Sequence, residues 1–325
     1  MQIESPGFFD LQVNGFAGVD FNNPDSSAED IVRAIKVIRA TGVTRFLPTL
    51  ITSSFERFAR CAKMLTQIRQ PEIAGLHMEG PYISPENGPR GAHPRQHVAL
   101  ASKDDFARRQ EAADGTIKLV TLAPEVSGAI QLIEHLVGSG IRVAIGHTTA
   151  APEFIRNAVK AGATLSTHLG NGCANMLPRH PNFIWEQLAA DDLFASLIVD
   201  GHHLPPATVK AMVRAKTPER TFLVTDGLAA SGCVPGVYEL NGERVVLSED
   251  GRVSQPGKPW LAGSAITLDQ AVANTVKFTG LPLEQVLPMA SSQPAIYLGI
   301  PTFGRLMADW NAAECRLSNL KVSDA

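Results

Sequence analysis

The chain has 325 residues, of which 44% are hydrophobic and 19% are charged, so it can bury a large core and is not disordered. Its 29 basic and 32 acidic residues give a net charge of −3, which gives no reason to expect a nucleic acid as a partner. We also expect no signal peptide and no membrane span, because the start lacks a basic, apolar leader and no run of about 18 apolar residues occurs. The four cysteines are widely spaced without a CxxC pair, which predicts reduced thiols in a cytoplasmic protein.

Short apolar runs alternate with amphipathic stretches along most of the chain. The runs lack the strict polar alternation of a half-exposed sheet, which indicates parallel strands buried on both faces. In chain order, the predicted strands cover residues 8–13, 44–49, 73–79, 119–123, 143–147, 163–168, 197–200 and 222–226.

Helical patterns lie between these strands. Apolar residues recur at helical spacing from Ile31 to Ile38, after the capping candidates Ser26 and Ser27 and before Gly42. Similar patterns predict helices over residues 55–65, 129–137, 152–161 and 205–213.

Eight strands with intervening helices predict an α/β protein with a (β/α)8 barrel, whose usual size of about 250 residues suits residues 6–290. A doubly wound sheet is the alternative, because alternation alone does not show closure. We assign residues 1–300 to the barrel, with a β-hairpin insertion at about 236–260 that turns at Asn241 and Gly242. Residues 301–325 are expected to be a C-terminal tail or the remnant of an accessory domain.

Five polar side chains follow apolar runs at their C-terminal ends: Glu79, His147, His168, His203 and Asp226. In a barrel these ends meet at the mouth, where active sites are built. Histidines scattered over a surface would not show this regularity.

Three of these residues could hold a metal ion. Two imidazoles, His147 and His168, with the carboxylate of Glu79 suit a divalent transition metal. The alternative is a pair of structural, hydrogen-bonded histidines. Asp226 could take a proton from water and return it to a leaving group, or it could merely cap the next turn.

A Gly/Pro-rich loop follows the third strand, at residues 85–94. His93 in this loop could donate a hydrogen bond to a substrate carbonyl or to a developing oxyanion. The alternative is a rigid surface loop. Because the chain has neither a P-loop nor a GxGxxG motif, it gives no indication of a nucleoside triphosphate or dinucleotide.

At this point the sequence resembles a known family, the N-acetylglucosamine-6-phosphate deacetylases of the amidohydrolase superfamily. The His-x-Glu-Gly-Pro and Thr-His-Leu elements are the most specific, and the matching stretches run in family order over residues 6–300. They are PGFFDLQVNG (6–15), GLHMEGP (75–81), TLAPE (121–125), GH (146–147), THL (167–169), DGHH (200–203), VTD (224–226) and AGS (262–264).

The resemblance implies one divalent metal ion bound by Glu79, His147 and His168. Zinc is the first expectation, with iron, manganese, cobalt or magnesium as alternatives. It also implies that Asp226 is the general base and acid, and that His93 helps to hold the acetamido carbonyl.

The same resemblance places Gln12, Gly80, Asn171 and His203 at the substrate. The family generally forms homodimers in which an arginine of the neighbouring subunit reaches the substrate phosphate. Arg179 is the matching position, so a homodimer is expected.

The chain departs from the family pattern in three respects. Gln12 and Asn14 stand where many relatives carry a His-x-His pair for a second metal, so a one-metal site is expected. The sequence GNGCANM at 170–176 replaces an aromatic-Asn-Ala-Met element near the sugar-phosphate pocket. The chain also starts almost at the first barrel strand, so the family's β-sandwich domain is expected to be missing or much reduced.

The expected reaction is hydrolysis of N-acetylglucosamine 6-phosphate to glucosamine 6-phosphate and acetate. The partner is thus a small molecule, not a nucleic acid or a membrane. One alternative is amide hydrolysis on another N-acetyl amino sugar, an N-acyl-D-amino acid or a cyclic amide. The other is a non-catalytic sugar-phosphate sensor that kept the barrel.

Overall fold

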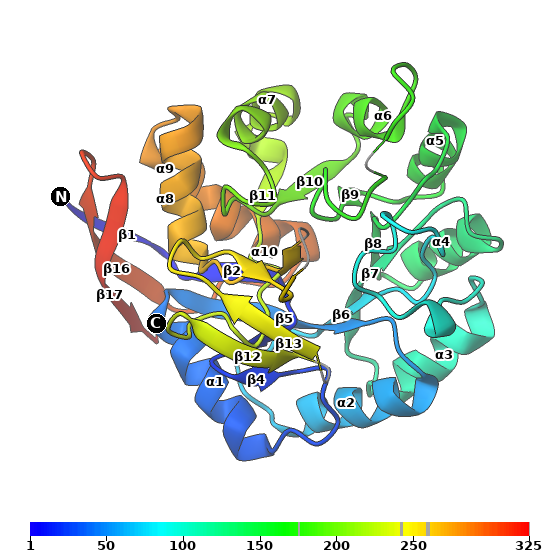
Figure 1. The fold of residues 1–325 in the computed structure, drawn as a ribbon, viewed down its shortest axis with the longest axis horizontal. Coiled ribbons are helices and arrows are strands. Elements are labelled where there is room, and N and C mark those ends of the chain that lie inside the picture. The colour runs from blue at the N-terminus through cyan, green and yellow to red at the C-terminus, as the bar shows by residue number, and fades with distance from the viewer. Residues whose placement is uncertain (175, 241–242, 258–260, 325) are drawn as a thin grey trace.

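The centre of the computed structural model is a barrel of eight parallel strands surrounded by helices (Figure 1). The structure describes residues 1–174, 176–240, 243–257 and 261–324. The strands follow one another around the barrel in chain order, without the reversal of a doubly wound sheet, which confirms the predicted barrel. They are β2 (Phe8–Val13), β5 (Val43–Ile51), β6 (Leu76–Glu79), β7 (Ile117–Leu122), β8 (Arg142–Ile145), β9 (Leu165–Ser166), β10 (Phe194–Leu197) and β11 (Thr221–Leu223).

The barrel closes between β2 and the segment after β11. The backbone nitrogens of Asn14 and Gly15 both donate to the carbonyl oxygen of Gly227. Slightly earlier in the same two segments, the carboxylate of Asp10 accepts a hydrogen bond of 2.6 Å from the Thr225 hydroxyl. The closing joint therefore lies beside Asp226, at the mouth of the barrel.

The outer helices begin where the sequence provides caps. The side chains of Ser27, Ser54 and Ser102 each accept a hydrogen bond from a backbone N–H in the first turn. Pro152 and Pro206 each open a helix, at a position where a missing N–H costs nothing. The outer helices are α1 (Ala28–Ala40), α2 (Phe55–Gln67), α3 (Lys103–Ala112), α4 (Ala129–Gly138), α5 (Pro152–Lys160), α6 (Phe183–Ala189), α7 (Pro206–Lys216) and α8 (Leu268–Thr279).

Shorter elements complete the chain around the barrel. A small hairpin follows β2 directly, and short helical segments precede α3, precede β11 and follow α8. They are β3 (Gly15–Phe16), β4 (Val19–Asp20), η1 (Arg95–His97), η2 (Pro218–Arg220), α9 (Leu283–Val286), η3 (Leu287–Ala290) and α10 (Ser292–Leu298).

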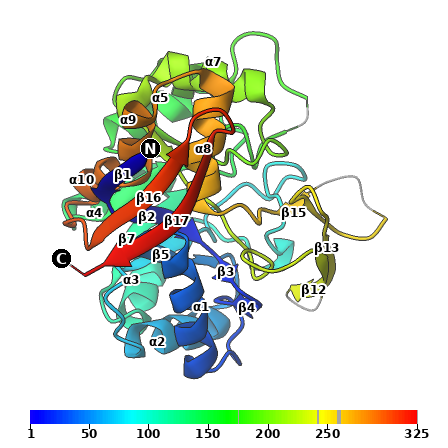
Figure 2. The ribbon, with the colours of Figure 1, turned by 90° about the vertical axis from the view of Figure 1, so that its left-hand side faces the viewer.

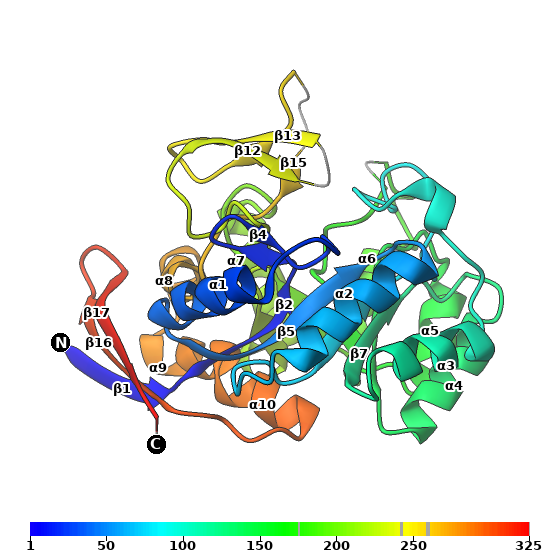
Figure 3. The ribbon, with the colours of Figure 1, turned by 90° about the horizontal axis from the view of Figure 1, so that it is seen from below.

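A four-stranded antiparallel sheet stands off one end of the barrel (Figure 3). We call it the cover sheet, and it occupies the region where a hairpin insertion is predicted. The predicted turn residues, Asn241 and Gly242, lie outside the described residues. The sheet has a small core of its own, formed by Ala229, Ala230, Val245, Leu247 and Val253. Its strands are β12 (Gly236–Leu240), β13 (Glu243–Leu247), β14 (Val253–Ser254) and β15 (Leu261–Gly263).

A third sheet joins the two ends of the chain (Figure 2). It consists of β1 (Gln2–Pro6), β16 (Arg305–Asn311) and β17 (Arg316–Ser323), paired antiparallel in the order β1-β16-β17. Because Leu306, Trp310 and Leu317 are buried, β16 and β17 pack against the rest of the fold. Among the described residues, no helix combines the length and apolar character needed to cross a membrane.

Candidate metal centre and active site

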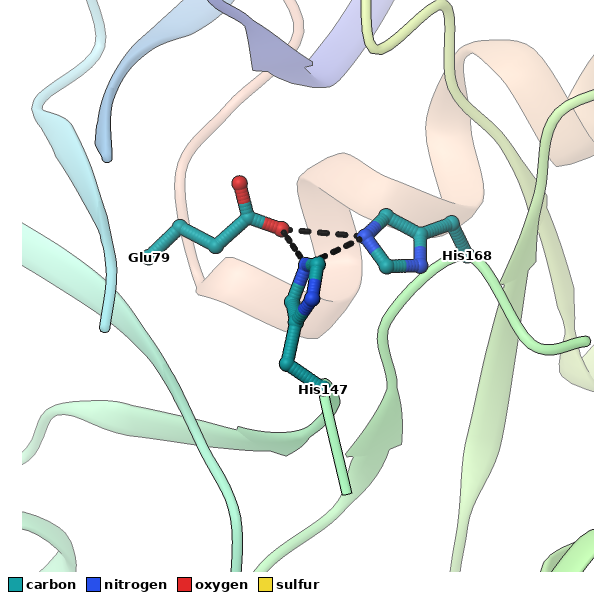
Figure 4. A group of neighbouring side chains, drawn as sticks. All are labelled: Glu79, His147 and His168. Atoms are coloured by element: carbon teal, nitrogen blue, oxygen red, sulfur yellow. Dashed lines mark hydrogen bonds and ion pairs between the residues drawn. The ribbon is translucent and has the colours of Figure 1, made fainter. Parts of the chain in front are cut away.

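Three buried side chains from separate strands converge on one point at the barrel mouth (Figure 4). Glu79 ends β6, whereas His147 and His168 follow β8 and β9. Glu79 Oε1 lies 3.1 Å from His147 Nε2 and 3.0 Å from His168 Nε2. The two Nε2 atoms lie 3.2 Å apart. The predicted trio is thus brought together.

The chemistry of this cluster fits a divalent metal ion. Nδ1 of His147 lies 2.8 Å from the carbonyl oxygen of Pro89, and because a carbonyl can only accept, Nδ1 carries the proton. Nε2 of His147 therefore turns its lone pair to Glu79 and His168. Lone pairs that converge in a buried site repel one another unless a cation or a proton lies between them. Two imidazoles and a carboxylate are ligands that zinc and similar ions accept.

The carboxylate of Glu79 is held in its ionised form. Burial alone would raise its pKa, but the neighbouring imidazole rings of His147 and His168 outweigh burial and hold the pKa well below its ordinary value. Gln12 adds a hydrogen bond of 2.9 Å from Nε2 to the same oxygen, Oε1. A metal ion would therefore meet a charged and oriented ligand.

Three residues at the site adopt left-handed backbone conformations. The φ angles are 52° at His147, 29° at His168 and 48° at Asp226. A side chain in this region costs roughly 1–2 kcal/mol, and such strain concentrates at functional sites. At these positions it accompanies the turn that follows each strand end.

The cluster opens into a pocket of about 360 Å³. This volume lies in the range typical of small-molecule sites. The cover sheet closes one side of the pocket, and the loop after His168 closes another. The wall includes Glu79, His93, His147, His168, Asn171, Cys173, His203, Asp226 and the β15 residues Leu261–Gly263.

Asp226 faces this pocket with a carboxyl group suited to proton transfer. Burial, followed by the negative charge of Glu79, raises its pKa to about 6. Asn14 Nδ2 donates a hydrogen bond of 2.6 Å to Oδ1 of Asp226. The other carboxylate oxygen, Oδ2, takes no part in this bond. A group with a pKa near neutrality can both take and return a proton at working pH.

His93 is oriented as a hydrogen-bond donor. Its Nδ1 lies 2.8 Å from the Thr52 hydroxyl and accepts a longer bond, 3.4 Å, from the Thr52 backbone N–H. Since Nδ1 accepts, the ring proton lies on Nε2, which is 3.7 Å from Glu79 Oε2. Burial, together with the neighbouring His147, lowers the pKa of His93 to about 3, so the ring is a neutral N–H donor.

His203 is oriented by Asp200. Nδ1 of His203 lies 2.6 Å from Asp200 Oδ2, so Nε2 is the nitrogen left for other partners. Burial opposes the charge on Asp200, but its hydrogen bonds to His203 outweigh burial and lower the pKa of the carboxyl. His203 lines the pocket, as does Asn171, whose Nδ2 donates to the carbonyl oxygen of His168.

The other predicted site residues lie outside the pocket wall. Gln12 is buried behind Glu79. Gly80 has a φ of 77°, and a Cβ there would come within 2.2 Å of the Thr52 hydroxyl, so only glycine fits. Arg179 is exposed on the loop before α6 and does not line this pocket.

Sequence reasoning missed several partners of the site. Thr52 and His93 lie 41 residues apart, as the separation of their hydrogen bond shows. The sequence indicates only that Asn14 replaces a metal-binding histidine, whereas in the structure it contacts Asp226, which is 212 residues away. Neither pairing has a local signal in the sequence. The pairing of β5 with β6 brings Thr52 towards the loop that carries His93, and the closure of the barrel brings Asn14 to Asp226.

The chain is similar to known proteins over most of its length. The amidohydrolase family profile matches residues 3–312. The N-acetylglucosamine-6-phosphate deacetylase of Lysinibacillus sphaericus is 33% identical over 312 residues, covering 94% of this chain and 79% of the relative. The N-acetylgalactosamine-6-phosphate deacetylase of Escherichia coli O157:H7 is 33% identical over 301 residues, covering 91% and 78%.

Solved structures give the same result. A mutant N-acetyl-D-glucosamine-6-phosphate deacetylase from Mycobacterium smegmatis, in complex with N-acetyl-D-glucosamine-6-phosphate, superimposes with a TM-score of 0.90 at 30% identity. The match covers 98% of this chain and 85% of that chain. The deacetylase structure from Pasteurella multocida has a TM-score of 0.86 at 27% identity, covering 98% and 86%.

Proposed function

The chain belongs to the amidohydrolase family, and we propose that it removes the acetyl group from an N-acetylhexosamine 6-phosphate. N-acetylglucosamine 6-phosphate is the first candidate substrate. The observation that carries the proposal is the convergence of a metal-binding trio, a carboxyl group with a pKa of about 6 and a neutral N–H donor on one pocket.

The three residues of the trio would hold an ion that acts as a Lewis acid. A divalent ion held by Glu79, His147 and His168, with zinc as the first expectation, would polarise the amide carbonyl and lower the pKa of water from about 15.7 towards about 7. His93 Nε2 then donates to the carbonyl oxygen and to the oxyanion that develops from it. Because His93 is neutral and fixed by Thr52, it needs no reorganisation for this task.

Asp226 moves the proton in both halves of the reaction. Its carboxylate first removes a proton from the attacking water as the C–O bond forms. The carboxylic acid then gives that proton to the nitrogen while the C–N bond breaks, releasing acetate and the amino sugar. An amine leaves poorly without a proton, so one carboxyl group acts first as base and then as acid.

His203 and Asn171 are assigned to the sugar. Both line the pocket beside the metal-binding trio, and His203 offers Nε2 because Asp200 holds Nδ1. A ring nitrogen and a side-chain amide are suitable partners for sugar hydroxyls.

The phosphate needs a cation that the pocket itself does not supply. Among the described residues, the pocket wall contains no lysine and no arginine. Arg179 is exposed, and its resemblance to the family position assigns it to a neighbouring site. We therefore place the partner subunit's Arg179 at the substrate phosphate of a homodimer.

N-acetylgalactosamine 6-phosphate is the second candidate substrate. Relatives named for either epimer are both 33% identical to this chain. The first part of the unusual segment 170–176 lines the pocket, where Asn171 and Cys173 belong to the wall.

The test is acetate release by metal-reconstituted protein. The panel contains both N-acetylhexosamine 6-phosphates, both unphosphorylated sugars and an N-acetyl-D-amino acid. We expect the highest kcat/KM for one of the 6-phosphates. Faster turnover of the amino acid would overturn the proposal. Sugar-phosphate binding without any acetate release would assign the chain to a sensor instead.

A further inference from the structure

Two neutral amides approach the two carboxyl groups of the site from the same strand end. Gln12 lies near the end of β2, and Asn14 lies in the bend directly after the strand. Gln12 Nε2 donates to Glu79 Oε1 at 2.9 Å, and Asn14 Nδ2 donates to Asp226 Oδ1 at 2.6 Å. Each amide thus meets a different carboxyl group.

The orientation of each amide follows from its partner. An ionised carboxylate only accepts hydrogen bonds, so the NH2 end of the amide must face it. Asn14 Oδ1 is buried and makes no hydrogen bond within the described part of the chain, so the amide's contact is the one to Asp226. An amide donor fixes a carboxylate without adding charge, whereas a lysine or arginine would lower the pKa of Asp226 strongly.

The backbone at both amide residues is hydrogen-bonded to neighbouring groups. Asp10 accepts hydrogen bonds from the Gln12 backbone N–H and from the Thr225 hydroxyl, and Asn14 N donates to the Gly227 carbonyl. These bonds tie the end of β2 to the segment that carries Asp226. The side-chain donors are therefore in place before a substrate arrives.

We propose that Gln12 and Asn14 are positioning residues with separate tasks. Gln12 orients Glu79 for metal binding, and Asn14 orients Asp226 for proton transfer. The second task rests on the proposed function, whereas the first is independent of the substrate. Through Asn14, one oxygen of Asp226 is occupied and the other is directed to the reacting proton.

The test compares two variants, Gln12→Met and Asn14→Leu. Each replaces the amide by an apolar side chain of similar size and so removes the NH2 donor. We expect Gln12→Met to weaken zinc binding by about tenfold or more, the usual loss when a partner of a metal ligand is removed. Its lost acetate release should return in excess zinc. Asn14→Leu should lower kcat by about tenfold or more with the zinc Kd within about twofold, and excess zinc should not restore it.

A matched control separates positioning from general stability. Gln187 is also buried, and its Nε2 donates to the Phe183 carbonyl within α6, away from the pocket. Gln187→Met should lower Tm without changing zinc Kd or kcat. If both site variants lower only Tm, or if both change the same quantity, the proposal is wrong.

A third variant extends the comparison at position 14 from a lost donor to an added negative charge. Asn14→Asp keeps the shape but replaces the donor by a negative charge against Asp226. The acidic limb of kcat should therefore move to higher pH in the order wild type, Asn14→Leu, Asn14→Asp. An unchanged limb in both variants would contradict the role of Asn14.

The zinc titrations need no substrate, so they distinguish this proposal from the proposed function. If the wild-type protein releases no acetate, the function fails, while 13C NMR of labelled aspartate carboxyls still measures the pKa of Asp226. That pKa should rise in Asn14→Leu, because the Asn14 hydrogen bond lowers it. An unchanged pKa would overturn the task assigned to Asn14.

Discussion

Asp226 is the residue on which the proposed proton transfers depend. Asp226→Asn keeps the size of the side chain but removes the proton acceptor. We expect kcat to fall by at least about a hundredfold with the metal content unchanged. Steady-state kinetics together with metal analysis of the same sample provide the measurement. Near-normal turnover would remove Asp226 from the mechanism.

Asp10 makes the stability of the protein depend on pH. Burial raises its pKa from an ordinary 3.8 to about 7, against the opposing hydrogen bonds from Thr225 and Gln12. The folded state therefore binds a proton that the unfolded state releases, and this stabilisation is lost as pH rises from about 4 to about 7. The loss amounts to roughly 4 kcal/mol across that window.

The variant Asp10→Asn cannot titrate, so its free energy of unfolding should fall less steeply over this pH range. Urea unfolding of both metal-free proteins at several pH values measures the two slopes. The absolute stability of the variant does not enter the comparison. Equal slopes would show that Asp10 does not titrate in this range.

At the residue scale, position along a strand was the informative signal. Glu79, His147, His168 and Asp226 could be predicted because each follows a buried run, and parallel strands bring such ends together. Their hydrogen-bond partners could not be predicted, because only tertiary packing brings Gln12 to Glu79 and Asn14 to Asp226. The contact of Asp200 with His203 is different, because the two residues are only three positions apart.

At the scale of elements, the loop over residues 84–94 is linked to the metal centre. Ser84 N donates to the His147 carbonyl, and His147 Nδ1 donates to the Pro89 carbonyl. A metal ion on Nε2 keeps the proton on Nδ1 and so strengthens the second bond. Metal binding should therefore order the loop.

Hydrogen exchange measures this coupling directly. We expect zinc to slow amide exchange over residues 84–94 several-fold more than in β16, which lies in the terminal sheet away from the mouth. Uniform slowing throughout the chain would reflect only the overall stabilisation that any bound ligand provides.

Helices could be predicted where apolar spacing and caps agreed, as in α1 and α2. Helix α3 was not predicted, because only Phe106 and Arg109 are buried on it and the rest is polar. Strand β10 begins at Phe194, earlier than the predicted residues 197–200. Its Ala195 and Ser196 have little strand preference, and pairing with β9 and β11 imposes the conformation.

For the molecule as a whole, the terminal sheet should contribute substantially to stability. Deleting residues 305–325 removes the buried side chains of Leu306, Trp310 and Leu317 and uncovers Ile3. We expect the free energy of unfolding to fall by at least about 4 kcal/mol, since each large apolar side chain contributes about 1.5–3 kcal/mol on burial. Chemical denaturation measures the loss, and an unchanged midpoint and slope would mean that the sheet adds nothing.

The proposed homodimer can be tested by mixing two inactive variants. Arg179→Ala keeps Asp226, and Asp226→Asn keeps Arg179. If Arg179 serves the neighbouring site, a mixed dimer contains one complete site, so subunit exchange should restore part of the activity towards the phosphorylated substrate. If each Arg179 served its own subunit, or if the chain were monomeric, mixing would restore nothing.

The architecture as a whole was predictable from alternating strands and helices, but the additions to it were not. The cover sheet extends beyond the predicted hairpin because β14 and β15 are too short to show a pattern in the sequence. The terminal sheet pairs Gln2 with Asp309, a contact between opposite ends of the chain that no local pattern indicates.

The left-handed backbone at His147, His168 and Asp226 has an evolutionary consequence. At each position glycine would suit the chain better than the residue present. If the three side chains perform the proposed chemistry, selection for turnover would retain them against this strain. In a descendant released from that selection, glycine or asparagine should replace them early, so these three codons would record whether a lineage still performs the chemistry.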